Sequence, residues 1–89
     1  MMRVEWLQSA VDDLADIWVR AAGERRRDIT IASESVDLDL ALDPRNAGES
    51  RGGRQRVLFV GPLVVFFRME ADGRTVTVTG VRESRQRNP

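Results

Sequence analysis

The segment that most constrains the fold is RVLFVGPLVVFFRMEADGRTVTVTGVR, residues 56–82. It contains three runs of β-branched and aromatic residues, separated by the turn signals Gly61-Pro62 and Asp72-Gly73. An Asp-Gly pair between two apolar runs is a strong signal for a tight hairpin. The segment therefore predicts an antiparallel meander of three strands, with one face covered by other elements and the other face open.

The chain before the meander begins with a short strand and a helix. Val4 and Trp6 alternate with charged residues, as in a strand. Ser9, followed by Asp12, is typical of a capped helix start, and Gly23 is expected to end this helix. The predicted buried face of this helix is formed by Val11, Leu14, Ile17, Trp18 and Ala21. Trp6 and Trp18 are both expected to lie in the core.

Residues 24–42 carry two competing patterns. A helical spacing marks a predicted buried face of Ile29, Ala32, Val36 and Leu40, which Ile31, Leu38 and Leu42 widen. Residues 36–42 also alternate as a strand would. The abundance of Leu and Ala, and the proline that follows at position 44, favour a helix.

The order of these elements predicts the fold class. Residues 44–54 are polar and rich in glycine, which indicates a loop, and the tail from about residue 84 is expected to fray. The order is then β-α-α-β-β-β, which predicts an α+β protein. We expect one domain over residues 1–89, with two helices packed on one face of a small antiparallel sheet.

Composition excludes several kinds of site. The 89 residues include no Cys, His, Tyr or Lys. Disulfides, thiolate metal sites and Cys- or His-dependent nucleophilic catalysis are therefore excluded, and neither a metal nor a cofactor is expected. The longest apolar run, residues 58–67, contains Gly61-Pro62 and is too short to span a bilayer. We expect a cytoplasmic protein that does not bind membranes.

Charge divides the chain into two halves. Residues 1–50 contain six Arg and eleven acidic residues (6 − 11 = −5), whereas residues 51–89 contain eight Arg and three acidic residues (8 − 3 = +5). The two halves either neutralise each other or leave a dipolar field that attracts an anionic partner to one face. Residues 25–27 are three consecutive arginines at the predicted turn between the helices, and a solvated run is expected there.

Two stretches resemble the RelE/ParE superfamily of bacterial toxins: SAVDDLADIW in the first predicted helix, and LDPRNAGESRGGRQRVLFVGPLVVFFRMEADGRTVTVTGVR. The resemblance covers residues 3 to about 83. It implies a β-α-α-β-β-β toxin of a type II toxin–antitoxin pair, bound by a cognate antitoxin protein. RelE-like members cut ribosome-bound mRNA, and ParE-like members inhibit DNA gyrase.

The resemblance also implies where an RNA-cleaving site would lie. Basic residues of cleaving members occupy regions where this chain has Arg54, Arg56, Arg68 and Arg82. Near the C-terminus, where those members often carry His or Tyr, this chain has residues 83–86, Glu-Ser-Arg-Gln, and its net charge is zero. RNA-cutting relatives are usually strongly basic.

RNA cleavage through the 2′-hydroxyl needs a base and a group that stabilises the charged phosphate. Glu49 is the candidate base, with Glu83 as the next choice. The predicted catalytic residues are Glu49, Arg51, Arg56, Arg68 and Arg82, and the predicted nucleic-acid-binding residues are Arg54 and Arg85. Strand alternation groups Arg68 with Val64 and Phe66, and Arg82 with Val76 and Val78. The phosphate-site hypothesis is strengthened if Arg56, Arg68 and the row Thr75, Thr77 and Thr79 share one open face, and it is removed if they lie on opposite faces. The sequence does not fix the strand register that decides this.

Three functions remain open at this stage. The first is a ribosome-dependent, metal-independent mRNA endoribonuclease, which the arginine-rich meander and Glu49 favour. The second is a non-enzymatic gyrase inhibitor, which needs no acid–base pair. The third is a non-toxic member of the superfamily that only binds its antitoxin. Neutral charge favours the second and third, and the placement of the arginines favours the first.

Overall fold

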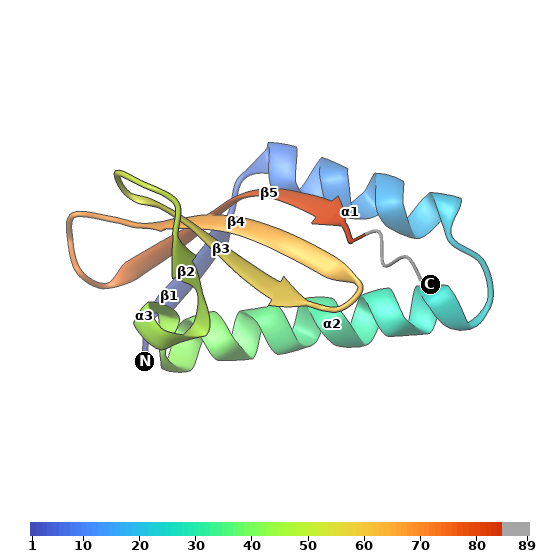
Figure 1. Ribbon diagram of the computed structural model, residues 1–89, viewed down its shortest axis with the longest axis horizontal. Helices are drawn as coiled ribbons and strands as arrows, with labels where there is room; N and C mark the ends of the chain where they lie inside the picture. The colour runs from blue at the N-terminus through green and yellow to red at the C-terminus, as the bar shows by residue number, and fades with distance from the viewer. Residues whose placement is uncertain (85–89) are drawn as a thin grey trace.

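The computed structural model describes residues 1–84, and its elements follow the predicted order with two short additions (Figure 1). The elements are β1 (Arg3–Trp6), α1 (Gln8–Arg20), α2 (Glu24–Leu42), α3 (Pro44–Ala47), β2 (Glu49–Ser50), β3 (Gln55–Val60), β4 (Leu63–Met69) and β5 (Thr75–Glu83). The α+β class is confirmed.

The sheet has the strand order β1-β5-β4-β3-β2. Strands β3, β4 and β5 form the predicted antiparallel meander, and β2 extends it along the outer edge of β3. However, β1 pairs with β5 in the parallel sense, so the sheet is mixed rather than purely antiparallel. The parallel pair is possible because a long connection through both helices separates β1 from the meander.

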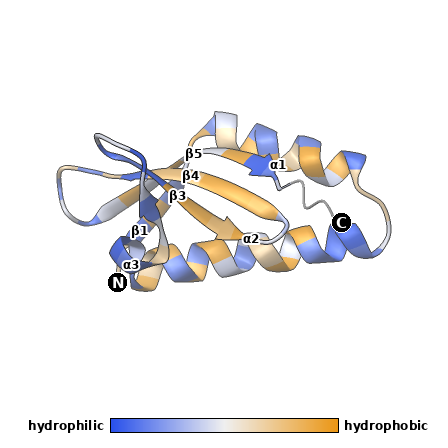
Figure 2. Ribbon diagram, in the orientation of Figure 1, coloured by the Kyte–Doolittle hydropathy of each residue, from blue (hydrophilic) through white to orange (hydrophobic). Residues whose placement is uncertain are grey.

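Helix α2 covers one face of the sheet, and α1 lies along β5 (Figure 1). The predicted face of α2, residues Ile29, Ala32, Val36 and Leu40, is buried, which confirms the helical interpretation of residues 36–42. These residues share one core cluster with Ala10 of α1 and with alternate residues of the sheet. Figure 2 shows β4 as hydrophobic over most of its length, as expected of a central strand.

Two sets of apolar residues predicted to be buried are exposed. Ile31, Leu38 and Leu42 do not widen the buried face of α2, because they lie on its solvent side. Trp18 is also not a core residue: 41% of its surface is exposed, and the guanidinium of Arg26 lies 4.4 Å from its ring centroid. Arg26 is therefore not merely solvated, and neither is Arg25, whose Nη2 lies 2.7 Å from Oε2 of Glu83.

The ends of α1 differ from the predicted ones. The helix begins at Gln8, so Ser9 lies in its first turn and does not cap it. The Ser9 hydroxyl instead donates to the backbone carbonyl of Thr79 in β5, at 3.2 Å. The helix ends at Arg20, and Gly23, with a φ of 57°, is the residue that precedes α2. A positive φ favours glycine at this turn.

The predicted loop over residues 44–54 contains α3 and β2. Proline occupies the first position of α3, where its missing N–H costs no helical hydrogen bond. At the other end of the described chain, the backbone N–H of Ser84 donates to the carbonyl of Pro62 at 2.7 Å. Among residues 1–84, no helix is both long enough and apolar enough to cross a membrane.

Candidate functional site

The register of the sheet separates Arg56 from Arg68. Arg56 is paired with Phe67, which is fully buried in the core, so the Arg56 side chain leaves β3 on the face that α2 covers. Arg68 is paired with Gln55 and is adjacent to Phe67 in β4, so its side chain leaves on the opposite, open face. The condition that Arg56, Arg68 and the row of threonines share one open face is therefore not met, because Arg68 and Thr77 lie on the open face and Arg56 does not.

Arg56 is held by main-chain carbonyls. Its Nη2 donates to the carbonyl oxygens of Arg45 at 2.7 Å and Gly48 at 2.9 Å. Its Nε is buried and has no hydrogen-bond partner among the described residues. These contacts fasten α3 and the start of β2 to β3. The Arg56 guanidinium therefore has a structural role, and its charge is not directed at the open face.

Arg68 belongs to a small polar cluster on the open face. Its Nε lies 3.2 Å from Oε2 of Glu70, and the hydroxyl of Thr77 donates to the same carboxylate. The Thr77 hydrogen bond holds the pKa of the Glu70 carboxyl below its usual range against partial desolvation, and Arg68 lowers it further. This cluster ties the end of β4 to β5 beside the Asp-Gly turn.

Arg82 also lies on the open face, contrary to the predicted grouping with Val76 and Val78. A bulge explains the difference: Phe66 pairs with Gly80 but Phe67 pairs with Val78, so β5 contains one extra residue, Thr79. An extra residue reverses the alternation of the residues that follow it. The guanidinium of Arg82 lies 5.5 Å from the ring centroid of Phe66.

The remaining predicted residues are spread out. Glu49 is exposed and pairs with Val57, which places it on the open face at the edge of the sheet. Arg51 and Arg54 are exposed in the turn between β2 and β3, where the Arg51 amide donates to the carbonyl of Gln55 at 2.8 Å. Arg85 lies outside the described residues.

Arg68 and Arg82 thus both lie on the open face, but they are far from each other. Arg82 is paired with Val64, four residues from Arg68 along β4, a separation of about 13 Å along a strand. Glu49 lies two strands away from Phe66, or roughly 10 Å. The predicted base and the phosphate-binding arginines therefore do not converge on one atom. Within residues 1–84, no three carboxylates come together as a metal site.

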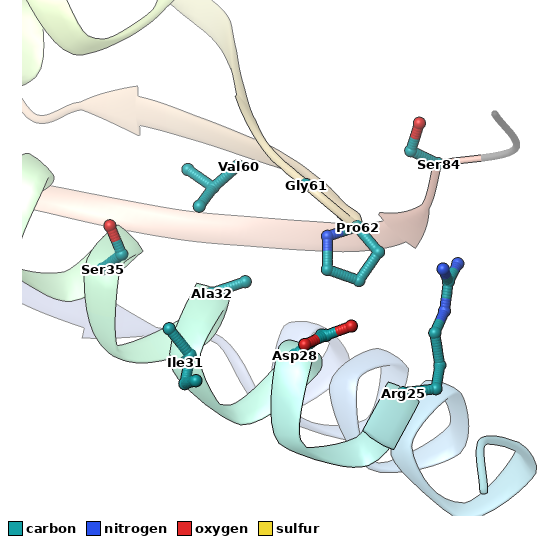
Figure 3. Close-up of a pocket in the computed structure, with 9 residues that line it drawn as sticks. All are labelled: Arg25, Asp28, Ile31, Ala32, Ser35, Val60, Gly61, Pro62 and Ser84. Atoms are coloured by element: carbon teal, nitrogen blue, oxygen red, sulfur yellow. The ribbon is translucent and has the colours of Figure 1, made fainter. Parts of the chain in front are cut away.

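A hollow of about 370 Å³ lies between the first half of α2 and the turn that joins β3 to β4 (Figure 3). Arg25, Asp28 and Ser35 bring polar groups to it from α2, and Pro62 borders it from the turn. Arg25 is bonded to Glu83 at 2.7 Å. None of the predicted site residues in the described part of the chain lines this hollow.

A second hollow, which the sequence interpretation missed, is an apolar groove of about 300 Å³ between α1 and α2. Its lining residues are Val11, Leu14, Ala15, Trp18, Val19, Ile29, Thr30 and Ser33. The signal was present in the sequence, because apolar residues of α1 occupy positions 14 and 15 and positions 17, 18 and 19. These residues cover a wider arc of the helix surface than a single face packed against the core would require.

Comparisons with known proteins agree with this fold. A sequence model described as the ParE toxin of the type II toxin–antitoxin system parDE matches residues 4–88. The chromosomal ParDE system of P. aeruginosa matches with a TM-score of 0.74 and 22% identity over 96% of this chain and 98% of that chain. No curated protein matches significantly.

Two further solved structures have the same fold. The toxin–antitoxin complex RelBE2 of Mycobacterium tuberculosis matches with a TM-score of 0.72 and 19% identity, over 92% of this chain and 96% of that chain. The isolated RelE toxin of E. coli matches with a TM-score of 0.67 and 12% identity, over 98% of this chain and 88% of that chain.

Proposed function

Because this chain belongs to the ParE toxin family of type II toxin–antitoxin systems, we propose that it inhibits DNA gyrase by binding and does not cleave nucleic acid. One observation carries the choice: Arg56 and Arg68 leave the sheet on opposite faces. A cleaving site needs its base and its phosphate-binding groups around one scissile bond, and this separation does not supply them.

A mechanism of inhibition by binding requires fewer catalytic groups than cleavage does. It needs no acid–base pair, so the absence of His and Tyr from the sequence does not count against it. Exposed cations remain available for binding, because Arg82 lies over Phe66 on the open face and both Arg51 and Arg54 are exposed in the turn between β2 and β3. Cations on one face accelerate association with an anionic partner such as a DNA-bound enzyme.

A second candidate is a RelE-like, ribosome-dependent and metal-independent mRNA endoribonuclease. It is favoured by the presence of Glu49, Arg68 and Arg82 on the same open face. In this mechanism the ribosome would have to bring the message to groups that the toxin holds apart. Arg68 would also have to exchange Glu70 for phosphate.

Either activity implies an antitoxin. Several solved structures of the same fold are toxin–antitoxin complexes, which supports a cognate antitoxin protein as the partner of this chain. The antitoxin would keep the toxin inactive in the cell, and a cytoplasmic location would give both proteins access to gyrase or ribosomes.

Two parallel assays test the proposal with one preparation of the full chain. The first measures supercoiling of relaxed plasmid by gyrase, and the second measures cleavage of mRNA on translating ribosomes. We expect inhibition in the first and intact message in the second. Message cleavage without gyrase inhibition would establish the endoribonuclease instead, and inactivity in both assays would contradict both activities.

A further inference from the structure

All three methionines of the chain line one hollow at the end of the sheet nearest the N-terminus (Figure 1). The hollow has a volume of about 280 Å³, and its other lining residues come from positions 41–45 and from the turn between β4 and β5. Met1 and Met2 are adjacent in sequence, but Met69 lies most of the chain away. Because the chain contains no Cys, every sulfur atom of the protein belongs to a residue of this hollow.

The strand order brings Met2 and Met69 together. Strand β5 lies between β1 and β4, and its residue Val76 pairs with Val4 on one side and with Met69 on the other. Met2 lies two residues before Val4, and both pack against the core. Met69 leaves β4 on the same face, because it alternates with the buried Phe67. Two strand spacings and two residues then separate the Cα atoms of Met2 and Met69, a distance of about 12 Å. Two extended thioether side chains with one metal ion between them span a distance of this size.

These methionines do not simply fill a gap in the core. Methionine often does so, because its unbranched side chain adapts to irregular space. Here, however, the hollow stays open beside Met2 and Met69, which are half-buried, and Met1 is 99% exposed. The Met2 amide donates to the carbonyl of Ala41 at 2.8 Å, which holds this residue against the end of α2. Two thioethers are thus held at the rim of an open hollow, and a third is the next residue in the chain.

The chemistry of the donors selects the class of ligand. The absence of Cys and His excludes thiolate and imidazole ligands, but thioether sulfur is also a soft ligand and favours Cu⁺. Mg²⁺ and Ca²⁺ need several oxygen ligands. Asp43 and Arg45 both line the hollow, and a single carboxylate beside a guanidinium is a poor site for a hard divalent cation. The donors present therefore fit a soft monovalent ion.

We propose that this hollow binds one soft monovalent metal ion, Cu⁺, through the thioether sulfurs of Met2 and Met69, with Met1 as a third ligand. The proposal goes beyond the toxin activity and does not depend on which target the toxin inhibits. The bound ion joins β1 to β4 across β5. It stabilises the folded chain, because the unfolded chain does not hold Met69 near the first two methionines.

The first experiment uses Ag⁺ as the probe, because it prefers the same soft ligands as Cu⁺ and is not oxidised by air. The full chain is labelled with ¹³C at the methionine methyl groups, which gives one NMR signal for each of the three methionines. Silver nitrate is added in buffer without chloride. We expect the signals of Met2 and Met69 to shift together and to saturate at one equivalent, whereas Zn²⁺ and Mg²⁺ should leave them unchanged.

Two further measurements use the same sample. Excess Ag⁺ should raise the midpoint of thermal unfolding by about 5 °C or more. Cu⁺, added without oxygen and in competition with a coloured Cu⁺ chelator, should also bind with a stoichiometry of one. Failure of Cu⁺ to bind would overturn the assignment of the natural ligand.

Matched variants locate the binding. Met69→Leu removes one sulfur with little change in volume and should weaken Ag⁺ binding about tenfold or more. The double variant Met69→Leu with Val19→Met keeps three methionines but moves one to an exposed position of α1, outside the lining of the hollow. It should bind as weakly as Met69→Leu alone. Met2→Leu gives an independent test of the second ligand, with the same loss expected.

No shift of the methionine signals, a shift of the Met1 signal alone, wild-type affinity in Met69→Leu and Met2→Leu, or recovery of affinity by Val19→Met would each overturn the proposal. Circular dichroism establishes that the variants are folded. Gyrase takes no part in these measurements, so a failure of the metal proposal and a failure of the gyrase proposal are distinguishable.

Discussion

The carboxylate of Asp13 in α1 accepts a hydrogen bond from the backbone N–H of Val81 in β5, at 3.0 Å. The parallel neighbour β1 ends at Trp6, opposite Val78, so β5 continues beyond it. The Ser9 hydroxyl bonds the carbonyl of Thr79 on the same stretch. Two side chains of one helix thus satisfy backbone groups that an edge strand would otherwise expose.

Replacement of Asp13 by Ala should lower the free energy of unfolding by about 1–3 kcal/mol, because the Val81 N–H loses a charged acceptor. Asp13→Asn keeps an acceptor oxygen and should lose less. Asp12→Ala is the control, because Asp12 is exposed and bonds only to Gln8 among the described residues. Urea unfolding measures all three, and equal stability of the Asp13→Ala and Asp12→Ala variants would contradict the role of this contact.

Replacement of Arg56 by Met should release α3 and β2 from β3, because it removes both bonds to the carbonyls of Arg45 and Gly48. We expect a loss of about 2–3 kcal/mol and faster hydrogen exchange at residues 48–50. Arg54→Met is the matched control at an exposed position. If Arg56→Met abolished activity while stability and exchange stayed at wild-type values, Arg56 would act in function and not in the fold.

Gly48 is needed because of close packing. A Cβ at this position would lie 2.6 Å from Cε1 of Phe67 and 2.8 Å from the carbonyl oxygen of Val57. Gly48→Ala should therefore destabilise the protein by about 1–3 kcal/mol. Gly61→Ala, where a Cβ meets no atom within 4 Å, should change the urea midpoint much less. A wild-type midpoint for Gly48→Ala would contradict the predicted clash.

Stability should fall in acid because of the hairpin between β4 and β5. The pKa of Glu70 is held below its ordinary 4.5 by Thr77 and Arg68, and the amide of Arg74 and the hydroxyl of Thr75 lower the pKa of Asp72 below 3.8. A carboxyl whose pKa is lowered by folding stabilises the protein fully at pH values above its pKa in the unfolded state. This contribution is lost as the pH falls through its pKa in the folded state.

Glu70→Gln should remove part of this dependence. Urea midpoints measured between pH 6 and pH 3, on either side of the ordinary carboxyl range, should decline less steeply in the variant than in the wild type. Glu5→Gln, at an exposed acidic residue on β1, is the control and should keep the wild-type slope. Parallel curves for wild type and Glu70→Gln would rule out Glu70 as a source of the acid sensitivity.

Arg82→Ala should weaken gyrase inhibition if the open face meets the target. Arg82 is exposed on that face, over Phe66, and the loss of one surface cation should raise the half-inhibitory concentration about 3- to 10-fold, more in low salt than in high salt. Arg74→Ala, at the exposed turn between β4 and β5, is the control. An unchanged inhibition curve for Arg82→Ala would place the target contact elsewhere.

Sequence reasoning succeeded where the signal was local. Asp72-Gly73 and the period of two around it predicted the hairpin of β4 and β5, and the spacing of Ile29, Ala32, Val36 and Leu40 predicted α2 and its buried face. The family resemblance, based on the order and cadence of the same segments, is confirmed by the match over residues 4–88. These features depend on neighbours within a few turns or one hairpin.

The faces on which the arginines lie depended on contacts between distant residues. A single extra residue at Thr79 moves Arg82 to the open face. Gly80, an isolated glycine within the strand pattern, is a local signal for such a bulge, but the pairing of β5 with β4 decides how the alternation changes. The exposure of Trp18 likewise depends on which part of α1 the rest of the fold covers, and the spacing of residues within the helix does not fix this.

The sequence by itself determined the α+β class, the meander, the long second helix and the absence of Cys, His and Tyr chemistry, because each rests on composition or short-range periodicity. Only the tertiary structure decided that Arg56 bonds to the backbone of α3, that Arg68 is paired with Glu70, and that an apolar groove lies between α1 and α2. Register and helix packing set these relations, and both arise when segments far apart in the chain meet.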